Sequence, residues 1–599
     1  MASLPGRPNG VNANASILLI FLVTALSIAV VLAACTAAPD DEDSPSSKPD
    51  RPSGSPASPV PYSGGGQSSA APSTASVPPG EEPLGWGPRS KDLAAARAAV
   101  AHMSPAQKAG QVLMGYYKGT DTTAQAKAIR ELHLGGSIVM RDNVPRSGDG
   151  TVDTSALARA TAELGKAARE DGRSWPALVG VDQEGGVVAR LGAPLTEWPT
   201  PLSYGAAGSA DLAAQGGKAM GAELAGLGFT VDFAPSADVT IGPNDPTVGS
   251  RSFSGDPEAA AMLSTSFGRG MLDGGVLPAS KHFPGHGSVT VDSHDEMPVQ
   301  DATAAQLRSR DWKPFLAAVQ AGQPMVMMGH IAMQSLEPGV PASVSSASYK
   351  ALRNLGFQGV VVTDALNMGA ITSKYPGESA APKALAAGAD LLLMPEDVRA
   401  AHRAILAALD DGSLSVQRLD EATVRVVTMM LWHARTHSVS PGSPSAAPQP
   451  SSTVQQPRST APPGSAAPVS RGVSAAAITV VDGPCTGRLV PESVTVTGGT
   501  TADRERFAAA ARRVGVAVGS GPVVALAGFG SGPVNGDVAV SLDAPWPLAR
   551  STARSKVALY GRTPGAYDAL LAVLTGAATA PGRLPAVVGP YPAGTGCKR

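Results

Sequence analysis

The sequence predicts an α/β protein, a (β/α)8 barrel of the TIM type that is followed by a smaller α/β sandwich domain. Short apolar segments alternate with Ala-rich helical segments along most of the chain, and polar residues recur where the apolar segments end. A second, shorter series of strand-like and helical segments follows a Pro- and Ser-rich stretch. Regular alternation of apolar strands with helices is typical of a parallel sheet that is covered by helices.

Composition divides the chain of 599 residues into five parts. This length exceeds that of one compact domain, and two Pro- and Ser-rich stretches have no apolar periodicity. We predict a signal segment over residues 1–35, a disordered linker over 36–88, the barrel over 89–438, a second linker over 439–475 and the C-terminal α/β domain over 476–599. The net charge of −2 indicates no basic surface for nucleic acid.

The first part of the chain has the features of an export signal. Arg7 precedes an apolar run over residues 15–34, and small residues come directly before Cys35. The end of this run resembles a bacterial lipobox, in which Cys35 would be lipidated and become the mature N-terminus. We therefore expect an exported protein that a lipid anchors to the cell membrane and that faces the cell wall. A retained transmembrane helix is the alternative, because the run is long enough to span a bilayer.

Eight segments of the first globular region have the composition of strands. They are residues 111–116, 136–140, 177–182, 229–234, 277–282, 325–330, 359–364 and 389–395. Helical composition separates most of them, as at residues 210–226, 258–273, 304–321 and 381–388. Eight such units fit a (β/α)8 barrel. A doubly wound open sheet is less favoured, since no Gly-rich phosphate loop follows the first strand.

Ionisable or polar side chains stand at or near the ends of most predicted strands. They are Asp182, Gln183, Glu184, Asp232, Lys281, His282, His330 and Asp364. The carboxyl ends of barrel strands meet at one face, which is where active sites of this fold lie. The repetition therefore predicts one polar pocket at that face.

The stretch from residue 281 to residue 294 is the strongest functional signal. Three of the chain's nine histidines fall between positions 282 and 294. One residue separates Asp292 from His294, so the two side chains can meet in an extended loop. A carboxylate beside an imidazole favours the protonated ring and orients it, which makes a proton donor near neutral pH. The alternative is a turn with exposed histidines.

Asp364 is a single carboxylate at the end of an apolar strand. Its backbone position fixes it and shields it partly from water, as a nucleophile requires; an N-cap for the following segment is the alternative. Retaining glycoside cleavage needs such a nucleophile and a second group that donates and then accepts a proton. The pair of Asp292 and His294 is the best-placed second group. Donors for a ligand rich in hydroxyl and carbonyl groups come from Arg190, Arg251, Lys281 and His282.

These motifs together resemble family 3 glycoside hydrolases. Residues 281–287, the triplet Asp292-Ser293-His294, residues 181–186 upstream and Asp364 downstream are similar to the β-N-acetylhexosaminidase branch, whose acid/base is a His–Asp dyad on a mobile loop. The resemblance implies that Asp364 is the nucleophile and forms a glycosyl–enzyme intermediate, and that Asp292 orients His294 as the acid/base. It also implies a set of residues that bind the terminal N-acetylglucosamine: Asp182, Arg190, Arg251, Lys281 and His282.

Asp232 departs from the family pattern, which often has an amide at this position. The resemblance covers the barrel from about residue 94 to residue 437. We expect no cofactor and no metal, a monomer, and N-acetylglucosamine-containing glycans or muropeptides as substrates. Transfer of the sugar to phosphate, which is reported for some members of the family, is an alternative to hydrolysis.

The region after residue 475 resembles the C-terminal α/β domain of the same family. Strands are predicted over residues 476–482, 494–497, 523–527, 538–542 and 557–560, with helices over 502–514 and 567–576. No acid, base and nucleophile converge there, so we expect a structural or wall-contacting role. Cys485 and Cys597 bracket the domain, and a disulfide between them is expected in an exported protein.

Two rival functions are less favoured. A metallohydrolase could use His282, His286 and His294 as ligands, but Pro284 and Gly285 prevent the first two from sharing a helix face as in zinc proteases. A wall-binding lipoprotein with an inactive barrel is the second rival. The intact nucleophile and dyad candidates speak against it.

Overall fold

The computed structural model describes residues 78–437, 461–528 and 530–598. Cys35, the predicted signal segment and most of the first predicted linker lie outside these residues. Residues 78–88, the last part of that predicted linker, are among the described residues, and Trp86 is buried in an apolar cluster that also contains Trp432. None of the helices in the described ranges is both long and apolar enough to cross a membrane.

Eight parallel strands form the barrel, as predicted. They are β1 (Leu113–Gly115), β2 (Gly136–Ile138), β3 (Leu178–Val181), β6 (Val231–Asp232), β7 (Leu277–Phe283), β9 (Met325–Met328), β11 (Val360–Thr363) and β12 (Leu392–Leu393). They pair in the order β11-β9-β7-β6-β3-β2-β1-β12. A parallel bridge from Val362 to Leu391 joins the two ends of the sheet. The strands are apolar and buried because helices cover the outside of the barrel.

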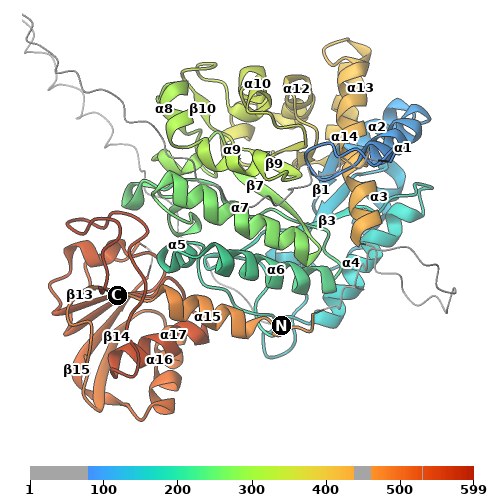
Figure 1. The fold of residues 1–599 in the computed structure, drawn as a ribbon. Helices are drawn as coiled ribbons and strands as arrows, with labels where there is room; N and C mark the ends of the chain where they lie inside the picture. The colour runs from blue at the N-terminus through green and yellow to red at the C-terminus, as the bar shows by residue number, and fades with distance from the viewer. Residues whose placement is uncertain (1–77, 438–460, 529, 599) are drawn as a thin grey trace, which may run out of the picture. The chain divides into compact units, whose positions relative to one another are not determined.

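Helices surround these strands (Figure 1). They are α1 (Ser90–Ala101), α2 (Pro105–Gln111), α3 (Thr123–Leu132), α4 (Thr154–Arg169), α5 (Leu202–Ala207), α6 (Ala210–Gly226), α7 (Pro257–Gly274), α8 (Ala304–Ser309), α9 (Lys313–Gln320), α10 (Ser346–Asn354), α11 (Gly369–Thr372), α12 (Ala380–Ala387), α13 (Val398–Asp410) and α14 (Val416–His437). The single helix predicted over 304–321 is divided into α8 and α9. Pro314 lies in the first turn of α9, where its missing N–H costs nothing, whereas a continuous helix would need that donor.

A buried ionic cluster lies at the amino end of β12, away from the face that carries the predicted site. Asp390 is fully buried and accepts hydrogen bonds from Arg353 (2.7 Å), Arg418 (2.7 Å) and Arg425 (3.0 Å). Its Oδ2 also accepts from the backbone N–H of Val361 in β11, at 3.0 Å. One carboxylate therefore ties α10, α14 and the closing strands of the barrel together.

Replacement of Asp390 by alanine should destabilise the barrel by about 3–5 kcal/mol, because three partly buried guanidinium groups lose their anion. Urea unfolding followed by circular dichroism measures this loss. Glu421→Ala is the control, since Glu421 pairs with Arg418 at 3.0 Å but its side chain is 60% exposed; a change within about 0.5 kcal/mol is expected there. An equally small change for Asp390→Ala would show that Asp390 does not hold α10, α14 and the closing strands together.

The C-terminal domain is built on a five-stranded sheet in the order β13-β17-β16-β15-β14. The strands are β13 (Thr479–Asp482), β14 (Ser493–Gly498), β15 (Ala517–Ala527), β16 (Val538–Ser541) and β17 (Ser555–Ala558). Only β13 runs antiparallel to its neighbour. Helices α16 (Thr501–Arg513) and α17 (Pro564–Leu574) accompany the strands, which appear in orange and red in Figure 1.

Helix α15 (Ala467–Ala477) occupies the end of the predicted linker and the start of the first predicted strand of this domain. Its sequence consists mainly of small residues, with four Ala and two Ser among eleven, and this composition showed no apolar periodicity. Packing holds it instead: Ala466 and Val473 belong to the apolar cluster of the barrel. Its last residue, Ala477, belongs to a second cluster with residues of the C-terminal domain.

The barrel and the C-terminal domain belong to one compact unit. Leu202 and Ala206 of α5 share an apolar cluster with residues of the C-terminal sheet. The backbone N–H and the hydroxyl of Thr200 both donate to the carbonyl of Tyr560, at 2.8 and 2.9 Å. The hydroxyl of Ser254 donates to the carbonyl of Pro585 at 2.7 Å.

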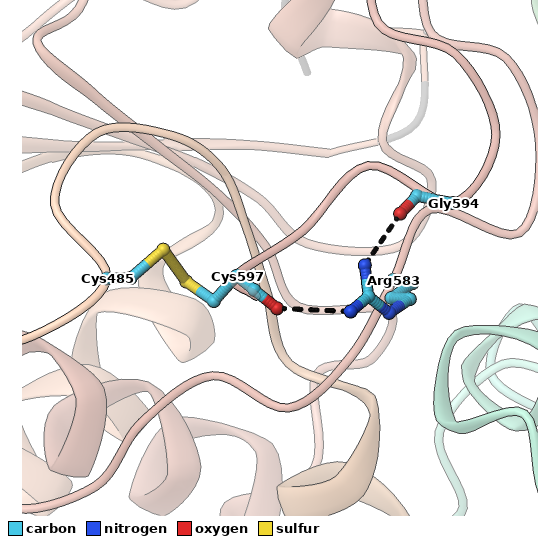
Figure 2. The surroundings of a disulfide bond; sticks show 4 residues. All are labelled: Cys485, Arg583, Gly594 and Cys597. Atoms are coloured by element: carbon cyan, nitrogen blue, oxygen red, sulfur yellow. Dashed lines mark hydrogen bonds between the residues drawn. A yellow bond between two sulfur atoms is a disulfide. The ribbon is translucent and has the colours of Figure 1, made fainter. Parts of the chain in front are cut away.

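Cys485 and Cys597, the predicted pair, form a disulfide with a Cα–Cα distance of 5.5 Å (Figure 2). The bond joins residues 112 positions apart and fastens the end of the described chain to the domain. Arg583 supports the same segment, since its guanidinium donates to the carbonyls of Gly594 (3.1 Å) and Cys597 (3.4 Å).

Candidate active site

The predicted site residues gather at the carboxyl ends of strands β3, β7 and β11 and in the loops that follow β3, β6, β7 and β11. Lys281 and His282 lie near the carboxyl end of β7, Asp182 directly follows β3, and Asp364 directly follows β11. An antiparallel hairpin of β4 (Gln183–Gly185) and β5 (Val188–Ala189) extends the β3 end.

Glu184 in β4 is the centre of a buried cluster of charges. Arg251 donates to both of its carboxylate oxygens, from Nε at 2.9 Å and from Nη2 at 2.7 Å. Lys281 Nζ lies 2.7 Å from Oε1. Burial acts to raise the pKa of Glu184, but the charges of Arg251 and Lys281 outweigh it and lower the pKa far below its usual range. Arg251, a loop residue that is usually solvated, is fixed because its charge is paired out of water.

Asp182 lies at the more open edge of this cluster, with 15% of its side chain exposed. Arg190 Nη2 donates to its Oδ2 at 2.9 Å, and Lys281 Nζ donates to its Oδ1 at 3.3 Å. Gln183 fixes the backbone of Arg190, since the side-chain oxygen of Gln183 accepts the backbone N–H of Arg190 at 2.9 Å. The structure thus brings Asp182, Arg190 and Lys281 together as acceptor and donors for a polar ligand.

Asp238 fixes the histidine-rich loop after β7. It is fully buried, and its Oδ2 accepts from His282 Nδ1 at 2.7 Å while its Oδ1 accepts the backbone N–H of His286 at 2.6 Å. A carboxylate only accepts, so Nδ1 carries the proton and Nε2 faces Arg251 Nη2 at 3.5 Å. Burial acts to raise the pKa of Asp238, but the influence of His282 lowers it.

Two of the three histidines in this stretch are not exposed as a turn would leave them, because His282 is 5% and His286 only 1% exposed. Gly287 is required by close packing: a Cβ there would lie 2.5 Å from the carbonyl oxygen of Val239. His286 Nε2 lies 2.9 Å from the hydroxyl of Ser293, which connects the buried part of the loop to the dyad.

Asp292 and His294 form the expected pair, with Nδ1 of the ring 2.7 Å from Oδ1 of the carboxylate. The backbone N–H of His294 donates to the same oxygen at 3.0 Å. Partial burial acts to raise the pKa of Asp292, but these hydrogen bonds from His294 lower it. The imidazole is 63% exposed and its Nε2 has room for a ligand.

The dyad loop packs against the segment that follows Asp364. The backbone N–H groups of Gly369 and Ala370 in α11 donate to the carbonyls of His294 (3.1 Å) and Ser293 (3.3 Å). A Cβ on Gly369 would lie 2.7 Å from the carbonyl oxygen of His294, so only glycine allows this approach. The structure therefore brings the β7 loop and the end of β11 to one place.

Asp364 is half-buried and held at two points. Its backbone N–H donates to the carbonyl of Met328 in β9 at 2.9 Å, and its Oδ1 accepts the N–H of Ala365 at 2.8 Å. Burial acts to raise its pKa, but the electrostatic influence of the neighbouring His282 lowers the pKa to about 2. Asp364 is thus ionised at neutral pH, and within the described ranges only its Oδ1 accepts a hydrogen bond.

His330 supports the backbone beside Asp364. Its Nε2 donates to the carbonyl of Ala365 at 2.9 Å, and its Nδ1 accepts from the hydroxyl of Ser343 at 2.7 Å. Burial lowers the pKa of His330, which favours the neutral ring that this pattern requires.

The pKa of Asp232 is shifted in the opposite direction to that of Asp364. It is fully buried, its Oδ1 accepts the N–H of Gln183 at 2.9 Å, and its Oδ2 has no partner among the described residues. Burial raises the pKa of Asp232 well above its usual range. A neutral carboxyl offers one donor and one acceptor, as an amide does, so Asp232 can form the hydrogen bonds that an amide would form here.

Sequence reasoning missed two residues of the site, Glu184 and Asp238. Glu184 was recognised only as a polar residue near a strand end, and Asp238 lies in a loop with no motif of its own. Both act through partners that are distant in sequence. Within the described ranges, no three His, Cys, Asp or Glu residues are grouped so that they could hold a metal ion.

The stability of the protein should fall as the pH is lowered from 7 to 5, partly because of His286. Burial and the neighbouring His282 lower its pKa to about 4, below the value of about 6.5 in an unfolded chain. Below pH 6.5 the unfolded state therefore binds a proton that the folded state does not. The contribution of His286 to the free energy of unfolding is fully present above pH 6.5 and is lost as the pH falls toward 4. At pH 5 this protonation lowers the free energy of unfolding by about 2 kcal/mol relative to pH 7.

Thermal or urea unfolding at pH 7 and pH 5 tests this contribution when the wild type is compared with His286→Gln. The variant should lose less stability between the two pH values than the wild type does, by about 2 kcal/mol. Equal losses in the two proteins would show that His286 is not the titrating group.

Comparison with known proteins identifies the family of the chain. A family model described as the glycosyl hydrolase family 3 N terminal domain matches residues 106–429. A protein named Beta-hexosaminidase A, from Pseudoalteromonas piscicida, is 32% identical over 331 residues, which cover 51% of this chain and 54% of that protein. Beta-hexosaminidase LpqI from Mycobacterium tuberculosis is 32% identical over 338 residues, which cover 55% of this chain and 83% of that protein.

A solved structure extends the similarity beyond the barrel. The glycoside hydrolase family 3 β-N-acetylglucosaminidase from Paenibacillus sp. str. FPU-7 is similar with a TM-score of 0.68 and 29% identity, over 81% of this chain and 98% of that chain. Since the family model matches more than half of the chain, the protein belongs to glycosyl hydrolase family 3 and is a glycosidase.

Proposed function

We propose that the protein is a retaining β-N-acetylhexosaminidase that releases terminal β-linked N-acetylglucosamine from cell-wall or chitin-like fragments. One observation carries the proposal. Asp364 is ionised at the carboxyl end of β11, and the pair of Asp292 and His294 lies on a loop that packs on the residues after it. A carboxylate nucleophile and a separate proton donor are the two groups that retaining cleavage needs. The names of the relatives support the choice of an N-acetylhexosamine as the sugar.

In the first step, a carboxylate oxygen of Asp364 forms a bond to the anomeric carbon while the bond to the leaving oxygen breaks. His294 gives its proton to that oxygen, so the leaving group departs as a neutral alcohol. In the second step, water attacks the anomeric carbon, His294 takes a proton from it, and the bond to Asp364 breaks. Asp292 orients the ring and stabilises its cationic form in both steps.

The terminal sugar would be held by the polar groups around Glu184. Asp182, Lys281 and Arg190 offer an acceptor and donors at the open edge of the cluster. His282 and Arg251 are fixed deeper in the site, by Asp238 and Glu184. These two would complete recognition of the sugar hydroxyls and the acetamido group from positions that cannot shift. Preorganised donors of this kind cost little to align when the substrate binds.

We also propose that the protein is exported and lipid-anchored at Cys35. The disulfide between Cys485 and Cys597 supports this, because such bonds persist in oxidising compartments. Mass spectrometry of the mature protein should detect diacylglycerol on Cys35. A retained signal segment without lipid would favour a transmembrane anchor instead.

Incubation of the full chain with muropeptides and with chitobiose, each with and without inorganic phosphate, tests the proposed activity. Free N-acetylglucosamine should be released from β-linked substrates in equal amounts under both conditions. Formation of the sugar 1-phosphate only when phosphate is present would assign phosphorolysis instead. Failure to release N-acetylglucosamine from any β-linked fragment would overturn the proposal.

A further inference from the structure

A cavity of about 500 Å³, separate from the dyad and Asp364, lies where the β4–β5 hairpin meets the C-terminal domain. Both parts of the chain line it, and the dyad loop and the end of β11 do not. Its volume is within the range of pockets that bind small molecules. Five arginines are among its lining residues: Arg141, Arg146, Arg190, Arg506 and Arg562.

Only two carboxylates, Glu197 and Asp543, line the cavity, and each is already paired. Arg506 lies 2.8 Å from Glu197, and Arg562 lies 2.6 Å from Asp543. Arg562 also pairs with Asp503 at 2.6 Å. The acidic groups therefore hold two of the arginines in place, Arg506 across the domain junction and Arg562 within the C-terminal domain, and leave the lining with an excess of positive charge.

Arg141 and Arg146 provide the uncompensated part of this charge. Neither forms an ion pair with another described residue; each donates only to a carbonyl, Arg141 to Ala189 at 3.1 Å and Arg146 to Gly150 at 3.0 Å. These bonds hold the guanidinium groups at the rim without neutralising them. A planar guanidinium with free donors is well suited to bind a carboxylate or a phosphate.

Arg190 connects the cavity to the sugar site. It lines the cavity, and its Nη2 donates to Asp182 at 2.9 Å. Its Nε is buried and has no hydrogen-bond partner among the described residues. A ligand in the cavity would therefore contact a residue that also shapes the sugar site.

We propose that this cavity is a binding site for an oxyanion, the carboxylate or phosphate of an acidic saccharide. The excess of arginine and the absence of an ion pair at Arg141 and Arg146 among the described residues support an anion, and the volume suits a saccharide. The assignment does not depend on the roles of Asp364 and His294, since it concerns binding and not turnover.

Calorimetric titration of the full chain tests the site with four probes: N-acetylmuramic acid, N-acetylglucosamine 6-phosphate, neutral N-acetylglucosamine and inorganic phosphate. The two acidic sugars should bind the wild type more tightly than the neutral sugar does. If inorganic phosphate alone binds as tightly as the phosphosugar, the anion is free phosphate; if it binds more weakly, the saccharide contributes. Both results support an oxyanion site.

The variant Arg141→Ala/Arg146→Ala should bind the acidic sugars about tenfold more weakly or worse, because two guanidinium groups are lost. Its turnover of a neutral nitrophenyl N-acetylglucosaminide should equal that of the wild type. Arg97→Ala/Arg403→Ala, which removes two exposed arginines outside the cavity, is the matched control. Unchanged affinity for the acidic sugars in the cavity variant, or equal affinity of the wild type for acidic and neutral sugars, would overturn the proposal.

Discussion

Replacement of Asp364 by glycine should reduce kcat for a nitrophenyl N-acetylglucosaminide on the order of 10⁴-fold. The proposed covalent intermediate cannot form without this carboxylate, and the structure places no other ionised carboxylate at the end of β11 within the described ranges. Asp364→Asn keeps the shape of the side chain and should lose a similar factor. Its circular dichroism should match that of the wild type, which separates lost chemistry from lost folding.

Chemical rescue distinguishes a nucleophile from a residue that only binds the sugar. With Asp364→Gly, azide can enter the vacated space and attack the anomeric carbon of an activated substrate. The product should be the α-glycosyl azide, since a single displacement inverts the β configuration. Rescue of turnover with that product would support the role of Asp364. Wild-type turnover in Asp364→Gly without azide would reject it.

Replacement of His294 by alanine should slow substrates with poor leaving groups by about 10²- to 10⁴-fold in kcat/KM. A dinitrophenyl leaving group needs no proton, so its kcat/KM should change by less than about tenfold. The second step still requires a base, so kcat for the dinitrophenyl substrate should fall more than kcat/KM does. This contrast is specific to a group that both donates and accepts a proton.

Two further variants give controls for His294. Asp292→Asn should produce the same leaving-group dependence in weaker form, because the ring keeps a hydrogen-bond partner but loses its stabilising charge. Glu296→Ala, at an exposed position of the same loop, should leave both substrates unaffected. Equal slowing of good and poor leaving groups in His294→Ala would remove His294 from the role of proton donor.

Much of the barrel could be predicted because its strands are almost entirely apolar and end at polar residues. All eight predicted barrel strands are present, since a buried parallel strand leaves a continuous apolar signature. The division between α8 and α9 was missed, although Pro314 marks it, because the Ala-rich composition continues across the break. Helix α15 was missed because its stability comes from packing on two domains and not from its own sequence.

The candidate site was predictable only where residues are close in sequence. Asp292 and His294 are two positions apart, so their contact could be expected before any fold was known. Glu184 and Asp238 could not be assigned in the same way, since they act on partners 67 and 44 positions away. Long-range ionic contacts of this kind depend on the closure of the barrel and leave no local pattern.

The shared apolar cluster of α5 and the C-terminal sheet has a consequence for how this protein can change over generations. Leu202 and Ala206 of the barrel lie in an apolar cluster with residues of the C-terminal domain. Conversely, Ala466 and Val473, at and in helix α15, lie in the apolar cluster of the barrel. A larger or smaller side chain on either side needs a compensating replacement on the other, because such contacts tolerate little change in volume. Substitutions at this interface should therefore accumulate in compensating pairs, and the barrel cannot be exchanged for that of another protein without changes in the C-terminal domain.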